Sequence, residues 1–238
     1  METLLIRERY KIVQVLHAQP DYAFAEAVDI QDRQTPACLV NVYEGAWLPR
    51  YAEVYAGLEG CPAFQGAFLQ GESLVAVFQP AQGLPIDRVF YRGARWGWRD
   101  RLEFAQLLLH QALTLCGLPP EIGCAALFSE NVLVDVDKRR VDLRYFIRPL
   151  EGMTPRELTL LAADQVEKIL LPRFSSADGE LAFLKQLRRG EFASMVPLYA
   201  AWRRALPQIE EEYQAMDRKN AIHRACALVW KNIKRKRR

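Results

Sequence analysis

The hydrophobic pattern of this chain changes its period once, after about ninety residues, and this change constrains the fold more than any other feature. Before it, β-prone runs predict strands at residues 10–16, 22–30, 36–43, 64–69 and 74–79. A helix is predicted at 48–58. After it, apolar residues recur at helical spacing from Arg99 to Leu115 and through most of 178–237. Two short strands, 131–135 and 141–146, interrupt the helical part, so the sequence predicts an α+β fold.

Composition places the chain among ordinary soluble globular proteins. Its 238 residues are half hydrophobic, enough for one large domain or two small lobes that share an interface. The N-terminus does not read as a signal peptide, and no run of about 18 apolar residues occurs. The five cysteines are widely spaced and the three histidines lie far apart. The sequence therefore predicts a cytoplasmic protein without a disulfide framework or a metal site.

One stretch carries a recognisable order of residues. Residues 124–135 read CAALFSENVLVD, and residues 143–147 read LRYFI. Their spacing and apolar positions match H-R-D-L-x-P-x-N-[ILV]-L-[ILV]-D followed by L-x-D-F-G, so the chain resembles the protein-kinase-like family. The resemblance implies a two-lobed kinase-like fold. It would consist of a small β-rich N-lobe with one helix (1–90), a shortened helical C-lobe (91–206) and a C-terminal helix with a basic tail (207–238).

The resemblance assigns the catalytic positions to residues that lack the required chemistry. Asn41 stands where the phosphate-binding lysine is expected, and a shift of one residue would put Val40 there instead. Ala126 replaces the catalytic base, and Tyr145 replaces the aspartate that binds magnesium. An alanine cannot accept a proton and a phenol is a poor ligand for Mg²⁺, so we expect no phosphoryl transfer, no cofactor and no metal.

Two residues of the family pattern are retained. Asn131 is expected to hydrogen-bond the turn before a strand, and Glu53 either faces solvent or pairs with an arginine. The loop at 16–24 has no glycine to approach phosphates, and Asp21 adds negative charge there. Only residues 148–153 remain where kinases carry their activation segment. Binding of a substrate peptide in the family manner is therefore not expected either.

Three other features bear on function. Cys124 reads as a buried, inert thiol, because no histidine lies close to it in sequence. Trp96 and Trp98, among arginines, either fill the seam between the lobes or form a partner-binding patch. The helix near the C-terminus carries acidic residues near its expected start, at 210–212, and has an apolar stripe. The stripe comprises Ile209, Tyr213, Met216, Ala221, Ala225, Leu228 and Val229.

The chain end is strongly basic. The net charge is +3, but the last eight residues carry six cations, which leaves +3 − 6 = −3 for the rest of the chain. The six cations are Lys231, Lys234, Arg235, Lys236, Arg237 and Arg238. They fit a segment beside an anionic membrane or beside an adjoining transmembrane helix, or a solvated tail. Nucleic-acid binding has less support, because no aromatic platform accompanies them.

The function that we predict from the sequence is that of a non-catalytic pseudokinase. It would act as a binding or scaffold module for an unidentified protein partner, on the cytoplasmic face of a membrane. That architecture is similar to the bacterial type VII secretion component of the EssB and YukC kind. One alternative is an enzyme with unusual nucleotide chemistry, using Asp135, Asp137 and Asp142. Another is an unrelated α+β domain, which a helix-rich first ninety residues would favour.

Overall fold

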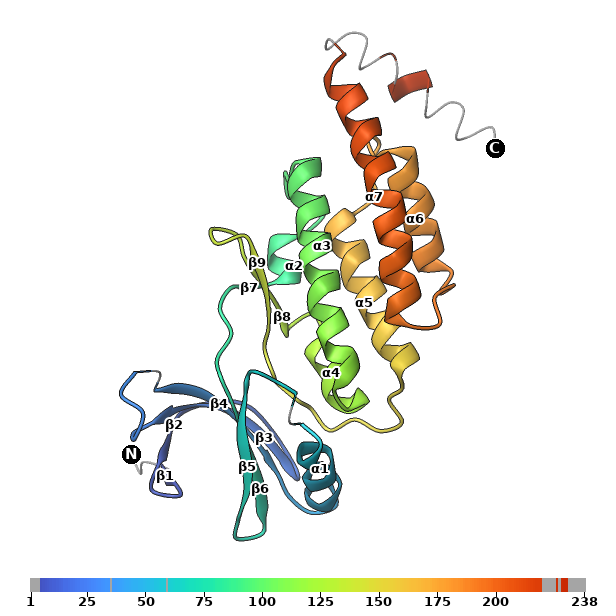
Figure 1. The fold of residues 1–238 in the computed structure, drawn as a ribbon. Helices are drawn as coiled ribbons and strands as arrows, with labels where there is room; N and C mark the ends of the chain where they lie inside the picture. Colours follow the sequence, from blue (N-terminus) through green and yellow to red (C-terminus); the bar gives the residue numbers. More distant parts are fainter. Residues whose placement is uncertain (1–4, 35, 59, 220–225, 227, 231–238) are drawn as a thin grey trace.

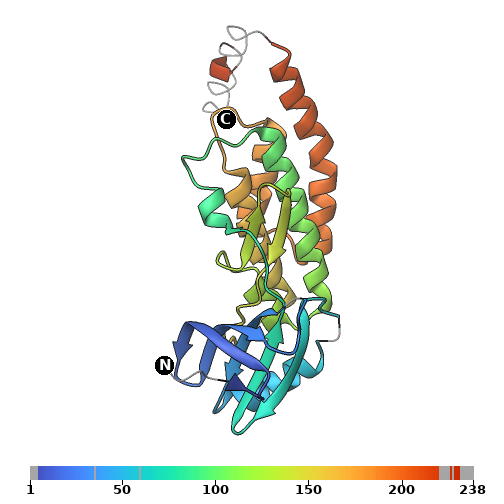
Figure 2. The same ribbon diagram turned by 90° about the vertical axis from the view of Figure 1, so that its left-hand side faces the viewer.

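A six-stranded antiparallel sheet lies at one end of an elongated α+β molecule, and a group of helices forms the rest (Figures 1 and 2). The computed structural model describes residues 5–34, 36–58, 60–219, 226 and 228–230. Residues 5–78 build the six-stranded sheet and one helix packed beside it, and we call this part the sheet half. Residues 84–217 build the rest, which we call the helical half.

The sheet half agrees closely with the predicted strands. Its elements are β1 (Leu5–Ile6), β2 (Tyr10–Gln19), β3 (Tyr22–Asp29), β4 (Ala37–Tyr43), α1 (Trp47–Ala56), β5 (Phe64–Gln70) and β6 (Ser73–Phe78). The strand order is β1-β2-β3-β4-β6-β5. These residues do not form the helix-rich beginning that would have favoured the interpretation as an unrelated α+β domain.

Period-two alternation sends successive side chains of this sheet into two different cores. Along β4, Leu39 and Tyr43 face the main core, whereas Cys38 and Val40 face a smaller core on the other side of the sheet. The smaller core forms because the sheet curls. Stacking of Tyr10 on Phe68, with ring centroids 5.9 Å apart, brings β2 close to β5.

The helical half packs against the inner face of this sheet through one continuous core. Its elements are β7 (Leu84–Pro85), α2 (Ile86–Val89), α3 (Trp98–Thr114), η1 (Leu115–Gly117), α4 (Pro120–Ala126), β8 (Val132–Asp135), β9 (Arg140–Leu143), α5 (Pro155–Leu170), α6 (Asp178–Arg188) and α7 (Met195–Asp217). Strands β7, β8 and β9 form a separate small sheet. Thr154 caps α5 as predicted, because its hydroxyl accepts a hydrogen bond from the Glu157 N–H at 3.4 Å.

A glycine permits the chain that leaves the sheet half to pass close to β8 of the helical half. Gly83 has φ +126°, and a Cβ at this position would lie 2.7 Å from the backbone carbon of Val134. No other residue type fits there without movement of the backbone.

The C-terminal helix begins earlier than we predicted. We expected it to start near residue 207, but α7 starts at Met195 and continues through Pro207. The acidic residues 210–212 therefore lie toward its end. Burial of Leu198 and Trp202 against the other helices explains why the helix extends on the N-terminal side of the proline.

The predicted apolar stripe is present in part. Ile209 and Tyr213 are buried, whereas Val229 is 52% exposed. Ala221, Ala225 and the six cations from Lys231 to Arg238 lie outside the described residues. Among the helices of the described chain, none combines the length and the apolar character needed to cross a bilayer.

The tryptophans do not fill a seam between the two halves. Trp96 packs on Phe90 and Phe104, and its Nε1 donates to the Val89 carbonyl at 2.8 Å. Trp98 stacks on Tyr213 of α7 with ring centroids 5.0 Å apart. All of these partners belong to the helical half, because α3 begins at the end of that half farthest from the six-stranded sheet (Figure 1).

Candidate functional site

The chain that follows β9 runs between the two halves without joining a sheet, and residues 144–150 are called the junction segment below. We predicted that this strand would extend to residue 146, but β9 ends at Leu143. The Arg144 N–H still donates to the Asn131 carbonyl at 2.7 Å, and beyond it side chains bind the backbone. Asn131 Nδ2 donates to the Phe146 carbonyl at 2.9 Å. Tyr51 OH donates to the Arg148 carbonyl at 3.2 Å and accepts from the Leu150 N–H at 2.9 Å.

Asn41 joins the middle of β4 to the junction segment. Its Oδ1 accepts hydrogen bonds from Tyr22 OH at 2.8 Å and from the Ile147 N–H at 3.0 Å. Its Nδ2 donates to the Tyr145 carbonyl at 3.0 Å. The residue is fully buried. The position where the resemblance expects a lysine therefore holds a neutral amide whose oxygen is bound by groups of the protein itself, and it supplies no charge for a phosphate.

A cluster of four buried tyrosines, Tyr22, Tyr43, Tyr51 and Tyr55, adjoins Asn41 through Tyr22. Tyr43 OH donates to the Ile147 carbonyl at 2.7 Å and lies 2.6 Å from Tyr55 OH. Tyr43 also stacks on Tyr51, with ring centroids 4.3 Å apart. Burial raises the pKa of Tyr22, Tyr43 and Tyr55 well above the usual value and that of Tyr51 to about 12. These phenols therefore stay neutral at physiological pH.

Aromatic rings fill the space on either side of the junction segment. Tyr145 stacks on Phe78 with centroids 5.0 Å apart, and burial raises its pKa. Phe146 stacks on Phe24 at 4.5 Å. A buried neutral phenol therefore occupies the position of the expected metal-binding aspartate, and its ring is used for packing.

Asn131 and the residues before it have structural roles. Asn131 Nδ2 also donates to the Ala125 carbonyl at 2.7 Å, so its predicted role in the turn before a strand is confirmed. Ala126 is the last residue of α4, where we had matched a catalytic loop, and it is fully buried. The predicted burial of Cys124 is also confirmed, and desolvation raises the pKa of its thiol to about 12.

The retained glutamate points away from the junction segment. Glu53 is exposed on α1 and takes part in none of the ion pairs of the described residues, which confirms the solvated interpretation. The buried face of α1 carries Tyr51 and Tyr55 instead. The β2–β3 connection is a two-residue turn at Pro20 and Asp21, as short as the predicted β-turn.

The carboxylates of the β8–β9 hairpin are engaged locally. Asp135 accepts from the Lys138 N–H at 3.0 Å, a bond that lowers its pKa, and Asp142 pairs with Arg140 at 2.6 Å. Within the part of the chain that the structure describes, no three His, Cys, Asp or Glu side chains form a group that could hold a metal ion.

Two hollows flank the junction segment. One of about 390 Å³ is lined by Gln19, Trp47, Phe128, Arg148, Pro149 and Leu150. The guanidinium of Arg148 pairs with Glu130 and packs over Phe128 and Phe146. The other, of about 590 Å³, is bordered by Gln79, Gln111, Arg140 and Asp142. In each hollow the arginine is already paired with a carboxylate, so neither presents an unpaired arginine to a nucleotide.

The sequence reasoning missed the tyrosines that bind the junction segment. A signal for them exists, because Tyr43 lies two residues after Asn41 on the same face of β4, and Tyr51 and Tyr55 are one helical turn apart.

Comparison of the chain with models of known protein families found no matching family, and comparison with curated proteins found no match. The function is therefore argued from the site alone.

Proposed function

We propose that this chain is a degenerate protein-kinase-like domain that does not transfer phosphate and acts as a binding or scaffold module. The order of elements supports this proposal, because the two-residue β1 is followed by three antiparallel strands (β2 to β4), a helix and two further strands, and the order from β2 onward is that of a kinase N-lobe. The proposed lobes correspond to the sheet half and the helical half. The partner is a protein that recognises the outer surface of the domain.

The observation that carries the proposal is the occupation of the junction by the protein itself. In a kinase, this region must admit a nucleotide, a lysine and a metal-binding aspartate. Here Asn41 and Tyr43 bind the backbone of Ile147, and Tyr145 stacks on Phe78. Admission of a nucleotide would break several buried hydrogen bonds, each of which leaves a polar group unsatisfied at a cost of about 1–3 kcal/mol.

The alternative of an enzyme with unusual nucleotide chemistry has weaker support. It needs a cation for phosphates and carboxylates that converge on a metal. Asp135 and Asp142 are paired with cations of their own hairpin, and Arg148 is paired with Glu130.

Thermal unfolding with and without ATP and Mg²⁺ tests the proposal. A ligand at one hundred times its Kd stabilises a protein by about 2.7 kcal/mol, which raises the Tm of a domain of this size by roughly 5–10 °C. We expect millimolar ATP with Mg²⁺ to leave the Tm unchanged, with Mg²⁺ alone as the control. A Tm that rises only when both are present would restore the enzyme interpretation.

The basic chain end supports a location at the cytoplasmic face of a membrane as part of this proposal. Six cations without an acid among the last eight residues favour an anionic surface or the edge of an adjoining span.

A further inference from the structure

An arginine-rich stretch runs from the end of α2 into the loop before α3, and we call residues 88–95 the arginine segment. Arg88, Arg92 and Arg95 are exposed, and Tyr91 between them is 57% exposed. None of the three arginines takes part in an ion pair among the described residues. The segment therefore presents three positive charges to solvent.

The carboxylates that border this segment are committed to other cations. Asp87 pairs with Lys168 at 3.3 Å. Asp100 pairs with Arg139 at 2.9 Å. Neither carboxylate therefore neutralises the arginine segment, so the positive charges of its three arginines face the solvent.

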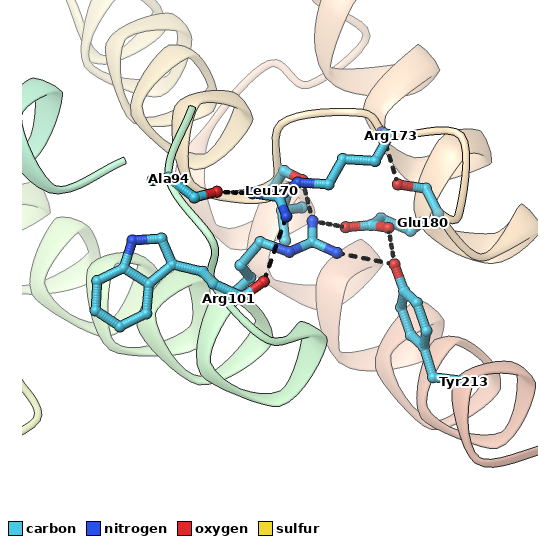
Figure 3. Close-up of polar contacts among 8 residues, drawn as sticks. Ala94, Arg101, Leu170, Arg173, Glu180 and Tyr213 are labelled. Atoms are coloured by element: carbon cyan, nitrogen blue, oxygen red, sulfur yellow. Dashed lines mark hydrogen bonds and ion pairs between the residues drawn. The ribbon is translucent and has the colours of Figure 1, made fainter. Parts of the chain in front are cut away.

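The backbone of the segment is anchored to the helical half (Figure 3). Arg173, in the loop after α5, donates through Nη2 to the Ala94 carbonyl at 2.6 Å and through Nη1 to the Trp96 carbonyl at 3.4 Å. The Trp96 ring packs in turn on Phe104 of α3. Partly buried contacts therefore hold the backbone at the C-terminal end of the arginine segment, which lowers the entropy that this part loses when the segment binds a surface.

A buried polar network joins the beginning of α3, which follows the arginine segment, to α7. Arg101 Nη1 pairs with Glu180 at 2.7 Å, and Arg101 Nη2 donates to Tyr213 OH at 3.0 Å, as Figure 3 shows. Trp98, three residues after Arg95, stacks on the Tyr213 ring. The arginine segment therefore runs from α2, alongside α3, to the end of the helical half away from the six-stranded sheet, where α3 begins (Figure 1).

Further positive charge follows later in the sequence. Arg218 and Lys219, just after α7, are exposed. Residues 220–238 contain seven more arginines and lysines and no acid. An anionic surface that attracts the arginine segment thus also attracts these positively charged residues of the chain.

Exposed aromatic rings accompany the arginines and indicate the kind of anionic surface. Phe174 is 57% exposed, as is Tyr91, and it follows Arg173, whose guanidinium binds the Ala94 carbonyl. Aromatic rings beside arginines are typical of loops that lie in the headgroup region of a bilayer, where the rings insert and the cations meet phosphates. We propose that the arginine segment is a docking surface for an anionic membrane.

This inference rests on the proposed membrane-side location, and vesicle binding tests the two separately. The probe is sedimentation of the 238-residue chain with vesicles of equimolar phosphatidylglycerol and phosphatidylcholine, against vesicles of phosphatidylcholine alone. The chain is expected to bind the anionic vesicles and not the neutral ones. Each basic residue near an anionic surface contributes about fivefold in affinity, so the triple variant R88Q/R92Q/R95Q should bind roughly 100-fold more weakly.

A matched variant controls for net charge. Lys11, Arg33 and Arg156 are exposed, and they too belong to none of the ion pairs of the described residues. The variant K11Q/R33Q/R156Q loses the same charge and should bind within about twofold of the parent. Thermal unfolding of all three proteins confirms that they are equally folded.

Each other outcome has a definite meaning. If the parent chain binds anionic vesicles and the R88Q/R92Q/R95Q variant binds them equally well, the arginine segment is not the docking surface, and the membrane-side location stands. If the parent does not bind, both are wrong. If duplex DNA binds the parent more tightly than the vesicles and the triple variant loses that binding, the surface belongs to a nucleic acid and the membrane inference is overturned.

Discussion

Asn41 Oδ1 accepts a hydrogen bond from the backbone N–H of Ile147 at 3.0 Å, which joins β4 of the sheet half to the junction segment 106 residues later. The same amide donates to the Tyr145 carbonyl. One neutral side chain therefore satisfies two backbone groups of a segment that has no strand partner. The position where the resemblance expects a phosphate-binding lysine is here part of the structural support of the junction.

Replacement of Asn41 by alanine should strongly destabilise the protein. The substitution leaves the Ile147 N–H, the Tyr145 carbonyl and Tyr22 OH without their partner in a buried place. Unsatisfied buried groups cost about 1–3 kcal/mol each, so we expect a loss of about 3 kcal/mol or more in the free energy of unfolding, measured in urea. Gln14→Ala, at an exposed position of β2, is the control and should change it by less than about 0.5 kcal/mol. A loss below about 1 kcal/mol for Asn41→Ala would contradict this role.

Most of the strands and helices could be predicted because their patterns are local. Residues 37–43 and 73–78 alternate between two buried faces, and Thr154-Pro155 marks the start of a helix by its capping chemistry. The start of α7 was missed because Pro207 interrupts a helix whose stability comes from burial of residues such as Trp202 against other helices. Such tertiary packing leaves no clear local pattern.

The candidate site was predictable only in what it lacks. The absence of a lysine at residue 41 and of an aspartate at 145 could be read directly from the sequence. What replaces them could not, because the bonds of Tyr43 and Tyr51 to the junction segment join residues about one hundred positions apart. The position at which β9 ends, Leu143, likewise depends on side chains that are distant in sequence.

The buried tyrosines predict a loss of stability at alkaline pH. Burial raises the pKa of Tyr43 in the folded state, so above a pH of about 10 the unfolded chain releases this proton while the folded chain keeps it. The stabilisation is therefore complete below about pH 10 and is lost as the pH rises, by about 1.4 kcal/mol per pH unit for each such group. Urea unfolding between pH 9 and 11 measures the slope.

A matched pair of variants identifies the source of that slope. Tyr43→Phe should reduce it by about 1.4 kcal/mol per pH unit. Tyr91→Phe should leave it unchanged, because the Tyr91 ring is 57% exposed. Equal slopes for Tyr43→Phe and the parent would show that Tyr43 is not held neutral by burial.

The buried pair of Arg101 and Glu180 should contribute far more than an exposed pair of similar geometry. Both of its side chains are almost fully buried, and Glu180→Gln leaves the guanidinium charge uncompensated at a cost of about 3–5 kcal/mol. The pair of Arg188 and Glu167, at 2.7 Å, is partly exposed on both sides, and Glu167→Gln should cost about 0.5 kcal/mol. The two variants are compared by urea unfolding, and similar losses for both would contradict the structural role of the buried network.

The retained kinase-like glutamate should contribute almost nothing, although its position matches the family pattern. Glu53 is exposed on α1, so Glu53→Ala should change the free energy of unfolding by less than about 0.5 kcal/mol. Tyr55→Phe, on the buried face of the same helix, removes the hydroxyl that lies 2.6 Å from Tyr43 OH and should cost about 1 kcal/mol.

Asn41→Lys should not create ATP binding, since the glutamate that would orient the new lysine faces solvent. A magnesium-dependent rise in Tm for Asn41→Lys would mean that α1 can turn its glutamate toward β4, and that the junction segment opens more easily than its hydrogen bonds indicate.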